Sequence, residues 1–457
     1  MLRMPSKKYS ILLNKFIPGG SHTYSRGADQ FSENAPEILL KGNGQFVYDI
    51  AKKKYLDYGM GLRSVAIGYN EKKINKSAIK QIENGINLTR PSVIELKAAQ
   101  EFVRHFDSVE MVKFTKNGST AVTAAVKLAR GYTKKNLVAR CYDHPFFSYD
   151  DWFIGSTAIK LGIPKVIQKL TLTFKYNDIQ SLKDLVRKYK NDLSCVVLEP
   201  STINCPYIDK KETHCCGQRI CSRDFKKNNF LIDVQNVCKE NNIVFILDEM
   251  ITGFRWNLYG AQKMYNLNPD ISTFGKAMAN GFPLAAVAGK SKIMELGGIS
   301  KKNQERLFLL STTHGAEMAS LGAFVATLDF YKKNNVIQSI WNYGYNLKNI
   351  FNSLSEEFGL TEFLRMEGIS CSPYYICLDE NKNSSNEFKT LLMQEMVKHN
   401  ILWPSFISIC YRHNNSNLRF TKKALLKAFR VYQLALRNGV KKYLKGNAIK
   451  PVFRKYN

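Results

Sequence analysis

A chain of 457 residues, 44% of them hydrophobic and 12% aromatic, can bury one large domain and a smaller one. These fractions exclude a disordered protein, and no uninterrupted apolar run in the sequence is long enough to span a bilayer. The formal charge of +29 is unusual, but the basic residues are scattered through a chain rich in Asn and Ile. The N-terminal apolar run is too short for a secretory signal, so we expect a cytoplasmic protein.

The first part of the chain, residues 1–75, predicts an N-terminal segment made of a short helix, a glycine-rich loop and a β-meander. Pro18, Gly19 and Gly20 end the helix. Residues 44–49 and 54–58 alternate between apolar and polar side chains, as paired strands do.

Residues 76–330 predict a large α/β domain with a mostly parallel central sheet, because helical patterns alternate there with short apolar strands. One such strand, residues 112–115, leads through small residues 117–121 into a helix over Val122–Arg130. Small residues at a helix N-terminus present free backbone N–H groups, which can bind an anion.

A buried parallel strand is predicted over Ile243–Leu247, and it ends at Asp248 and Glu249. Ligands of open α/β sheets bind at the carboxyl ends of strands. Further along, Lys276 lies in a loop of small residues. An acid and a lysine so placed suit a pyridoxal phosphate enzyme, in which the lysine forms a Schiff base and the acid pairs with the ring nitrogen. Taken alone, the two residues also fit a scaffold acid and a surface lysine.

The ten cysteines do not form a disulfide scaffold in a chain of this length. Six of them lie singly in mixed sequence, and we expect reduced thiols there: Cys141, Cys195, Cys238, Cys371, Cys377 and Cys410. An insertion at about 203–225 gathers Cys205, His214, Cys215, Cys216 and Cys221. Their spacing fits no zinc pattern, so we expect an irregular loop and no metal.

Residues 331–457 predict a small C-terminal α+β domain with a strand at 372–377 and a helix at 386–399. No acidic residue follows Glu395, and apolar positions interleave with basic ones: Lys422, Lys423, Lys427, Arg430, Arg437, Lys441, Lys442 and Lys445. This pattern predicts an amphipathic surface helix with a solvated basic face. Contact with an anionic surface or polymer is the alternative.

Two segments carry a family resemblance, residues 247–255 (LDEMITGFR) and 274–283 (FGKAMANGFP). They resemble the class III aminotransferases of fold type I, and most closely the glutamate-1-semialdehyde 2,1-aminomutase branch. The resemblance extends over about residues 10–440. It implies a large pyridoxal-phosphate-binding domain and a small domain built from the C-terminal part and the N-terminal segment.

The resemblance also implies the site. Lys276 would bind the aldehyde of pyridoxal 5'-phosphate, and Asp248 would pair with the ring nitrogen. The other cofactor contacts are assigned to Gly118, Ser119 and Thr312 at the phosphate, to Phe146 and Met250 at the ring faces, and to Asn204 near the ring 3-oxygen. Phe147 and His144 are rivals of Phe146 if the alignment is shifted.

Arg26, with Thr23 nearby, is the candidate for binding a substrate carboxylate, because a guanidinium recognises carboxylates in a bidentate way. In the family, the threonine that matches Thr312 reaches the phosphate of the neighbouring subunit. The resemblance therefore implies a homodimer with shared active sites. It implies neither a specific nucleic-acid partner nor membrane insertion.

Three functions stay open. The first is amino transfer between a small amino donor and a carbonyl acceptor, and the second is the intramolecular transfer of the aminomutase. Arg26 and the overall similarity of the sequence to the aminomutases favour the second. Four differences from the aminomutases favour the first. Asn117 and Thr120 depart from the family's phosphate-binding turn, and Phe146-Phe147 replaces its tyrosine-histidine pair. The chain also has the insertion, and it lacks the glutamate that aminomutases carry near Ser405–Ser408. The third, a non-catalytic binding protein, is disfavoured because Lys276 and Asp248 are both retained.

Overall fold

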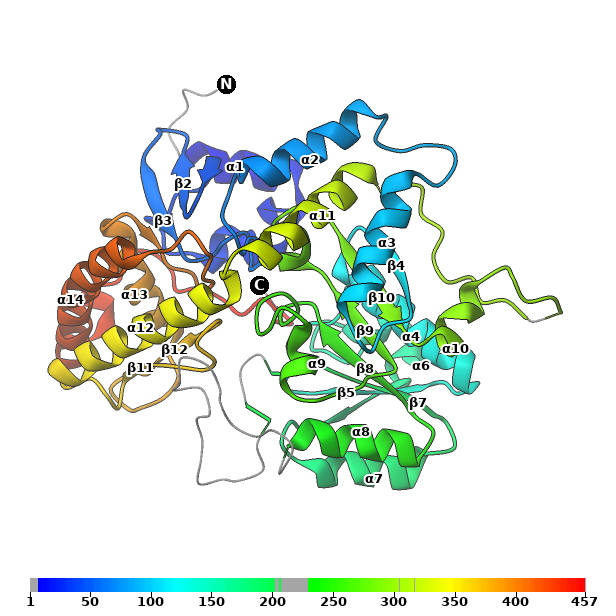
Figure 1. Ribbon diagram of the computed structural model, residues 1–457. Coiled ribbons are helices and arrows are strands. Elements are labelled where there is room, and N and C mark those ends of the chain that lie inside the picture. Colours follow the sequence, from blue (N-terminus) through cyan, green and yellow to red (C-terminus); the bar gives the residue numbers. More distant parts are fainter. Residues whose placement is uncertain (1–6, 202–204, 207–228, 304, 316, 457) are drawn as a thin grey trace. The chain divides into compact units, whose positions relative to one another are not determined.

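The computed structural model describes the chain except residues 1–6, 202–204, 207–228, 304, 316 and 457 (Figure 1). The described residues divide into two compact units. One unit lies between Lys72 and Ile337. The other combines the residues up to Glu71 with the residues from Gln338 onward.

The unit from Lys72 to Ile337 is built on a seven-stranded sheet of order β4-β10-β9-β8-β7-β5-β6. Strand β10 runs antiparallel to β4 and β9, while the remaining neighbours are parallel. The predicted mostly parallel α/β sheet is thus confirmed. Every residue of β7 and β8 is buried, which explains why these strands read as continuous apolar runs.

The strands of this unit are β4 (Met111–Thr115), β5 (Leu137–Cys141), β6 (Thr171–Phe174), β7 (Leu193–Leu198), β8 (Val244–Glu249), β9 (Ile271–Phe274) and β10 (Ala285–Gly289). Its helices are α2 (Lys72–Glu83), α3 (Val93–His105), α4 (Gly118–Thr133), α5 (Asp151–Ile154), α6 (Lys165–Gln168), α7 (Ile179–Tyr189), α8 (Phe230–Glu240), α9 (Gly260–Met264), α10 (Ser291–Met294) and α11 (Met318–Lys333).

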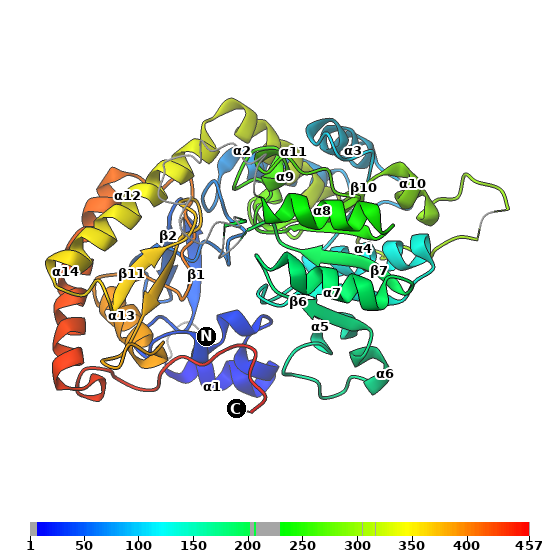
Figure 2. The ribbon, with the colours of Figure 1, turned by 90° about the horizontal axis from the view of Figure 1, so that it is seen from below.

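Helices cover the sheet because its strands are apolar along their whole length. Helix α4 packs on β7, β8, β9 and β10 through small buried residues such as Ala121 and Ala125. Helices α7 and α8 lie side by side along the sheet in both views of this unit (Figures 1 and 2). Helix α11 packs on α2 and α3. The carboxyl end of β8 and the N-terminus of α4 are therefore held together by the packing of this helix on the sheet.

The other unit holds a four-stranded sheet of order β1-β2-β3-β13 and a β11-β12 hairpin. The predicted hairpin of the N-terminal segment is confirmed, since β2 pairs antiparallel with β3. The strands are β1 (Leu39–Asn43), β2 (Phe46–Asp49), β3 (Lys54–Asp57), β11 (Leu364–Glu367), β12 (Tyr374–Cys377) and β13 (Ile401–Leu402). The helices are α1 (Lys7–Phe16), α12 (Val336–Glu357, which begins in the neighbouring unit), α13 (Asn386–Lys398) and α14 (Asn415–Asn438).

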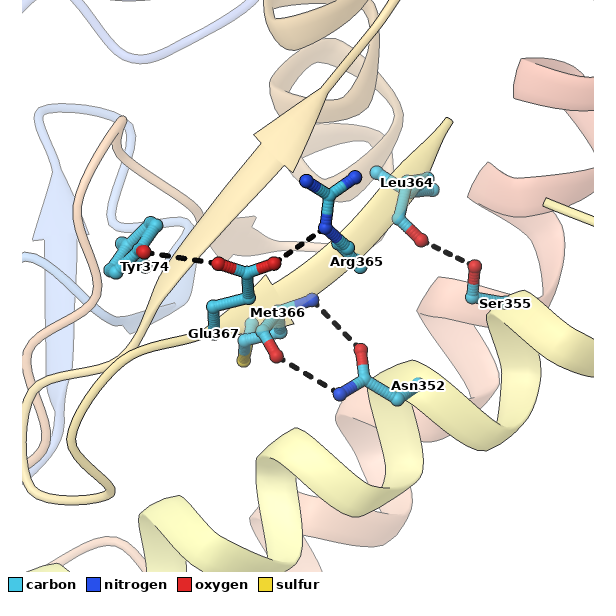
Figure 3. A network of polar contacts seen from close by, with 7 residues as sticks. All are labelled: Asn352, Ser355, Leu364, Arg365, Met366, Glu367 and Tyr374. Carbon is cyan, nitrogen blue, oxygen red and sulfur yellow. Dashed lines mark hydrogen bonds and ion pairs between the residues drawn. The ribbon is translucent and has the colours of Figure 1, made fainter. Parts of the chain in front are cut away.

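Side-chain hydrogen bonds fasten α12 to the hairpin (Figure 3). The Asn352 amide donates to the Met366 carbonyl over 2.9 Å and accepts from the Met366 N–H over 2.8 Å. Ser355 donates to the Leu364 carbonyl one turn further on. On the hairpin itself, Glu367 accepts from Arg365 and from Tyr374. These bonds fix the edge of β11 to the helix, so the strand leaves no unpaired polar groups on that side.

The six cysteines that lie singly in the sequence are buried free thiols, as predicted. His214, Cys215, Cys216 and Cys221 of the insertion lie outside the described residues. In the part of the chain that the structure describes, no helix is both long and apolar enough to cross a membrane.

Candidate functional site

The site is organised by Asp248 at the carboxyl end of β8. Its side chain is 3% exposed. Oδ1 accepts two hydrogen bonds of 2.9 Å, one from the Met250 N–H and one from the Thr273 hydroxyl on the neighbouring strand β9. Among the described residues, Oδ2 receives no hydrogen bond. One oxygen is thus used to hold the carboxylate in place, and the other is left for a ligand.

The charge state of Asp248 is set by its burial. Burial raises the pKa of this carboxyl from 3.8 to about 6, against the two hydrogen bonds and the positive charge of Lys276, which lower it. The positive charge of Lys276 thus favours the charged form of this carboxylate. A buried acid with a raised pKa near a lysine is typical of a functional site.

Lys276 opens the 3-10 turn η5 (Lys276–Ala279), which directly follows β9. Its φ of 45° lies in the left-handed region, where a non-glycine residue costs roughly 1–2 kcal/mol. Such strain persists where the surroundings fix the backbone, and it clusters at functional sites. The turn is held from outside by Tyr331 on α11, whose hydroxyl donates to the Ala277 carbonyl.

Met250 fills the space between this turn and α4. A Cβ built on Gly118 would lie 2.8 Å from the Met250 sulfur, and a Cβ on Gly275 would collide with the same atom. A side chain at either glycine would therefore displace the end of the methionine side chain. This close packing joins the N-terminus of α4, the end of β8 and the Lys276 turn into one cluster, which contains Gly118, Met250 and Lys276.

The N-terminus of α4 offers donors for an anion. Asn117 caps the helix, and its Oδ1 accepts the Thr120 N–H over 2.9 Å. Among the described residues, the Gly118 and Ser119 N–H groups have no acceptor. Two amides at the positive end of the helix dipole are thus left for an anion such as a phosphate. The helix begins earlier than the predicted Val122 because Asn117 provides this cap.

Ser119 also keeps a hydroxyl hydrogen to donate. Its Oγ is buried and accepts the Tyr149 N–H over 3.1 Å. Since the lone pair is used there, the hydroxyl hydrogen is free to point toward an anion at the helix N-terminus. Asn117 and Thr120, which differ from the family turn, act in capping and leave these donors intact.

The aromatic segment after β5 contains the three candidates for the ring-stacking position, and they differ in burial. Phe147 is 2% exposed and packs edge-on against Phe153. His144 is buried, accepts the Glu199 N–H, and has its pKa lowered to about 3 by burial and by the charge of Arg140. Phe146 is 45% exposed. Of the three, only Phe146 is exposed.

Four further residues were predicted for the site: Thr312, Asn204, Arg26 and Thr23. Thr312 is exposed, in the segment between α10 and α11. Asn204 lies outside the described residues. Arg26 and Thr23 are exposed and belong to the other unit, in and next to the turn η2 (Tyr24–Arg26). Among the described residues, no carboxylate forms an ion pair with the Arg26 guanidinium.

Thr273 is the functional residue that the sequence interpretation missed. It is fully buried on β9, where it fixes Oδ1 of Asp248. A signal was present, because a polar residue in a buried strand needs a partner, and Thr273 lies three residues before Lys276. Glu249, in contrast, is structural: its oxygens accept the Ala261 and Gln262 N–H groups at the start of α9.

These residues fit pyridoxal phosphate, the cofactor that the family resemblance implies. The open Oδ2 of Asp248 suits a protonated ring nitrogen, the Lys276 amine suits an aldehyde, and the Gly118 and Ser119 donors suit a phosphate. One molecule carries all three groups. The fit rests on the two unused amides and the half-bonded buried carboxylate of this structure.

The tight contact at Gly118 gives a testable expectation. Gly118→Ala should push Met250 out of place and weaken the binding of pyridoxal phosphate by about tenfold, or about 1.4 kcal/mol. Titration of the cofactor-free protein, followed by tryptophan fluorescence, measures this. In a Met250→Ala background the same change should cost little, because the clashing sulfur is gone. An equal loss in both backgrounds would refute the packing argument.

The chain was compared with known proteins. Residues 28–373 match the family model described as aminotransferase class III. A glutamate-1-semialdehyde 2,1-aminomutase of Francisella philomiragia is 31% identical over 62% of this chain and 63% of its own length. A 3-aminobutyryl-CoA aminotransferase of Cloacimonas acidaminovorans is 27% identical over 90% and 93%. The chain thus matches less than two thirds of the length of the Francisella relative.

Two solved structures establish the fold. The FumI protein of Sphingopyxis sp. MTA144 has a TM-score of 0.81 at 20% identity and covers 95% of this chain and 97% of its own. A glutamate-1-semialdehyde aminomutase of Pseudomonas aeruginosa PAO1 has a TM-score of 0.77 at 15% identity and covers 93% and 94%. Both agree with the predicted fold type I architecture.

Proposed function

Because this chain belongs to the class III aminotransferases, we propose that it is a pyridoxal-phosphate-dependent enzyme that moves an amino group between two small molecules. The observation that carries the proposal is the pairing of a buried strand-end carboxylate, Asp248, with the charge of Lys276. A non-catalytic binding protein would need neither group, and the burial of the Asp248 carboxylate would only weaken its fold.

Asp248 acts on the ring nitrogen. Above its pKa of about 6 the carboxylate is charged, and burial makes that charge unfavourable until a cation lies against it. A protonated ring nitrogen at Oδ2 supplies the cation. Thr273 and the Met250 N–H keep Oδ1 occupied, so the carboxylate cannot turn away.

Lys276 has two roles in the proposal. Its amine holds the cofactor covalently through the aldehyde, and once displaced by a substrate amine it moves a proton at the substrate carbon. When bound, pyridoxal phosphate supplies an electron-poor ring that accepts the electron pair left by that proton. The left-handed φ of Lys276 fixes the direction in which its side chain leaves the backbone.

Arg26 is proposed to bind the carboxylate of the substrate, with Thr23 beside it. The support is its exposed guanidinium without an ion-pair partner among the described residues. Arg26→Lys removes the bidentate fork but keeps the charge, so KM for a carboxylate substrate should rise by about tenfold, with a smaller change in kcat. Steady-state kinetics measure this, and Arg187→Lys, at another exposed arginine, is the control. An unchanged KM would remove Arg26 from the site.

The alternative is a glutamate-1-semialdehyde 2,1-aminomutase. It is favoured by the Francisella relative and by Arg26, but the altered phosphate turn and the insertion favour transfer between two molecules. The experiment is turnover of glutamate-1-semialdehyde as the sole substrate. Formation of 5-aminolevulinate would establish the aminomutase, while activity that needs a separate amino donor and acceptor would establish the aminotransferase.

We also propose a homodimer that shares its active sites. Thr312 is exposed in its own chain, and α2, α3 and their connection expose large apolar residues: Ile79, Ile82, Ile86, Leu88, Val93 and Leu96. Monomeric proteins rarely leave such a cluster in water. Light scattering should show a dimer, and Val93→Asp with Leu96→Asp should give an inactive monomer. A wild-type monomer with full activity would contradict the proposal.

The cytoplasm is the location that we propose. The six buried free thiols agree with a reducing compartment, whereas Cys205 of the insertion is disulfide-bonded. Cell fractionation tests this, and recovery in an oxidising compartment would contradict it.

A further inference from the structure

The C-terminal part of the chain concentrates positive charge. After Glu395 the sequence contains 14 lysines and arginines and no aspartate or glutamate. Residues 396–457 therefore carry 14 of the formal charge of +29, although they are a small fraction of the chain. The compositional bias of the whole chain does not explain this, because acidic residues are spread through the first 395 residues.

Helix α14 arranges part of this charge in a stripe. Arg419, Lys423, Arg430 and Arg437 follow one another at intervals of four, seven and seven residues, so they lie within about 40° of one another around the helix. All four are exposed. From first to last they extend over about 27 Å at 1.5 Å per residue. Lys422 and Lys427 flank the stripe, and both are exposed.

No carboxylate neutralises this stripe within the described part of the chain. The acids that pair with basic residues near the helix are used elsewhere: Glu395 by Lys398, Glu71 by Arg412, and Asp29 by Arg454. The pKa of His399 is lowered, first by burial and next by the charge of Lys427. The surface therefore carries an uncompensated positive field.

A recess lies at the N-terminal end of the stripe. It has a volume of 380 Å³ and is lined by Asn346, Asn349, Ile350, Asn415, Leu418 and Arg419, all from α12 and α14. Amide and guanidinium groups are donors to phosphate oxygens. The recess thus adds neutral hydrogen-bond donors to the charged end of the stripe.

The opposite face of α14 is buried, and this limits the kind of anionic partner that the helix can bind. Leu425, Phe429 and Tyr432 are buried in their own unit, and the Tyr432 hydroxyl donates to the Leu378 carbonyl. Figures 1 and 2 show α13 along this side of the helix. The apolar face is therefore not available for insertion into a bilayer. Charges spread over about 27 Å also exceed what a small metabolite can contact.

We propose that the exposed face of α14 binds the phosphodiester backbone of a nucleic acid without sequence preference. At 3.4 Å per base pair, 27 Å corresponds to about eight base pairs. Arg419, Lys423, Arg430 and Arg437 contact phosphates, and the recess receives the phosphate next to Arg419. This function goes beyond amino transfer and does not depend on it.

The test measures the salt dependence of binding to a fluorescein-labelled duplex of about 16 base pairs, and to single-stranded DNA and RNA of that length. Each phosphate contact contributes about −0.9 to the slope of log K against log salt for a duplex, and about −0.7 for a single strand. The variant R419Q/K423Q/R430Q/R437Q should reduce the duplex slope by about 3 to 4 and weaken binding at least about tenfold. The control K72Q/K160Q/K183Q/K239Q removes the same charge from scattered exposed sites and should keep at least most of the wild-type slope.

Several outcomes decide the matter. Loss in the α14 variant alone supports the assignment, and the preferred probe tells DNA from RNA as the source of the backbone. Equal loss in both variants, no binding, or binding only to phosphatidylserine vesicles would overturn it. A second measurement needs no variant: bound duplex should protect Lys422, Lys423 and Lys427 from acetylation while Lys239 stays reactive.

Discussion

Lys276→Ala should give a folded protein that binds pyridoxal phosphate only non-covalently and has lost roughly 10⁴-fold of its amino-transfer rate. Two functions are removed at once, since the amine both holds the cofactor and moves the proton. Borohydride reduction followed by mass spectrometry should fix the cofactor on the wild-type peptide that contains Lys276, and on no peptide of the variant. Lys292→Ala, at an exposed lysine of the same unit, should behave as the wild type.

The backbone conformation at Lys276 allows an independent test of the same site. Because φ is 45°, glycine fits this position without strain, whereas alanine does not. Lys276→Gly should therefore be more stable to urea than Lys276→Ala by about 1 kcal/mol, although both are inactive. Equal stabilities would mean that the left-handed conformation is not present in solution.

Asp248→Asn should lower activity by roughly 10²–10³-fold and yet stabilise the cofactor-free protein. Burial raises the pKa of Asp248 from 3.8 to about 6, so the native state binds more protons than the unfolded chain between these pH values. The contribution of this residue to the free energy of unfolding thus falls as the pH rises from about 4 to 6. Above pH 6 the full penalty of about 3 kcal/mol applies, and asparagine avoids it.

Urea unfolding at about pH 8 and about pH 4 checks this expectation, since the gain should be present at the higher pH and absent at the lower. Asparagine keeps Oδ1 as an acceptor for both hydrogen bonds of Asp248. Glu249→Gln is the matched contrast. Burial raises the pKa of Glu249 as well, to about 7, but both of its oxygens accept backbone amides. Glu249→Gln loses one of these bonds, so it should stabilise the protein less than Asp248→Asn does. A gain at Asp248 that does not change with pH would contradict the account.

Much of the architecture could be predicted from the sequence because the signals were local and periodic. Strand β8 reads as an apolar run that ends in an acid, and the β2-β3 hairpin reads as an alternation. Buried parallel strands must be apolar on both faces, so composition alone marks them. The family resemblance then supplied the roles of Asp248 and Lys276, which two isolated residues could not.

What could not be predicted depended on contacts between distant residues. Thr273 holds Asp248 from the neighbouring strand, and Met250 fills the space that a side chain at 118 or 275 would occupy. The early start of α4 depends on the hydrogen bond from the Thr120 N–H to the Asn117 side chain. The choice among Phe146, Phe147 and His144 needed burial, because all three are aromatic and lie within four residues.

The most direct test of the central claim is a single half-reaction. Purified protein loaded with pyridoxal phosphate is mixed with glutamate, without any carbonyl acceptor, and the 2-oxoglutarate released is measured per subunit. We expect one equivalent, together with loss of the visible absorption of the lysine-bound cofactor, and neither change in Lys276→Ala. If neither glutamate nor any other amino donor changes the bound cofactor, amino transfer is not the activity of this chain.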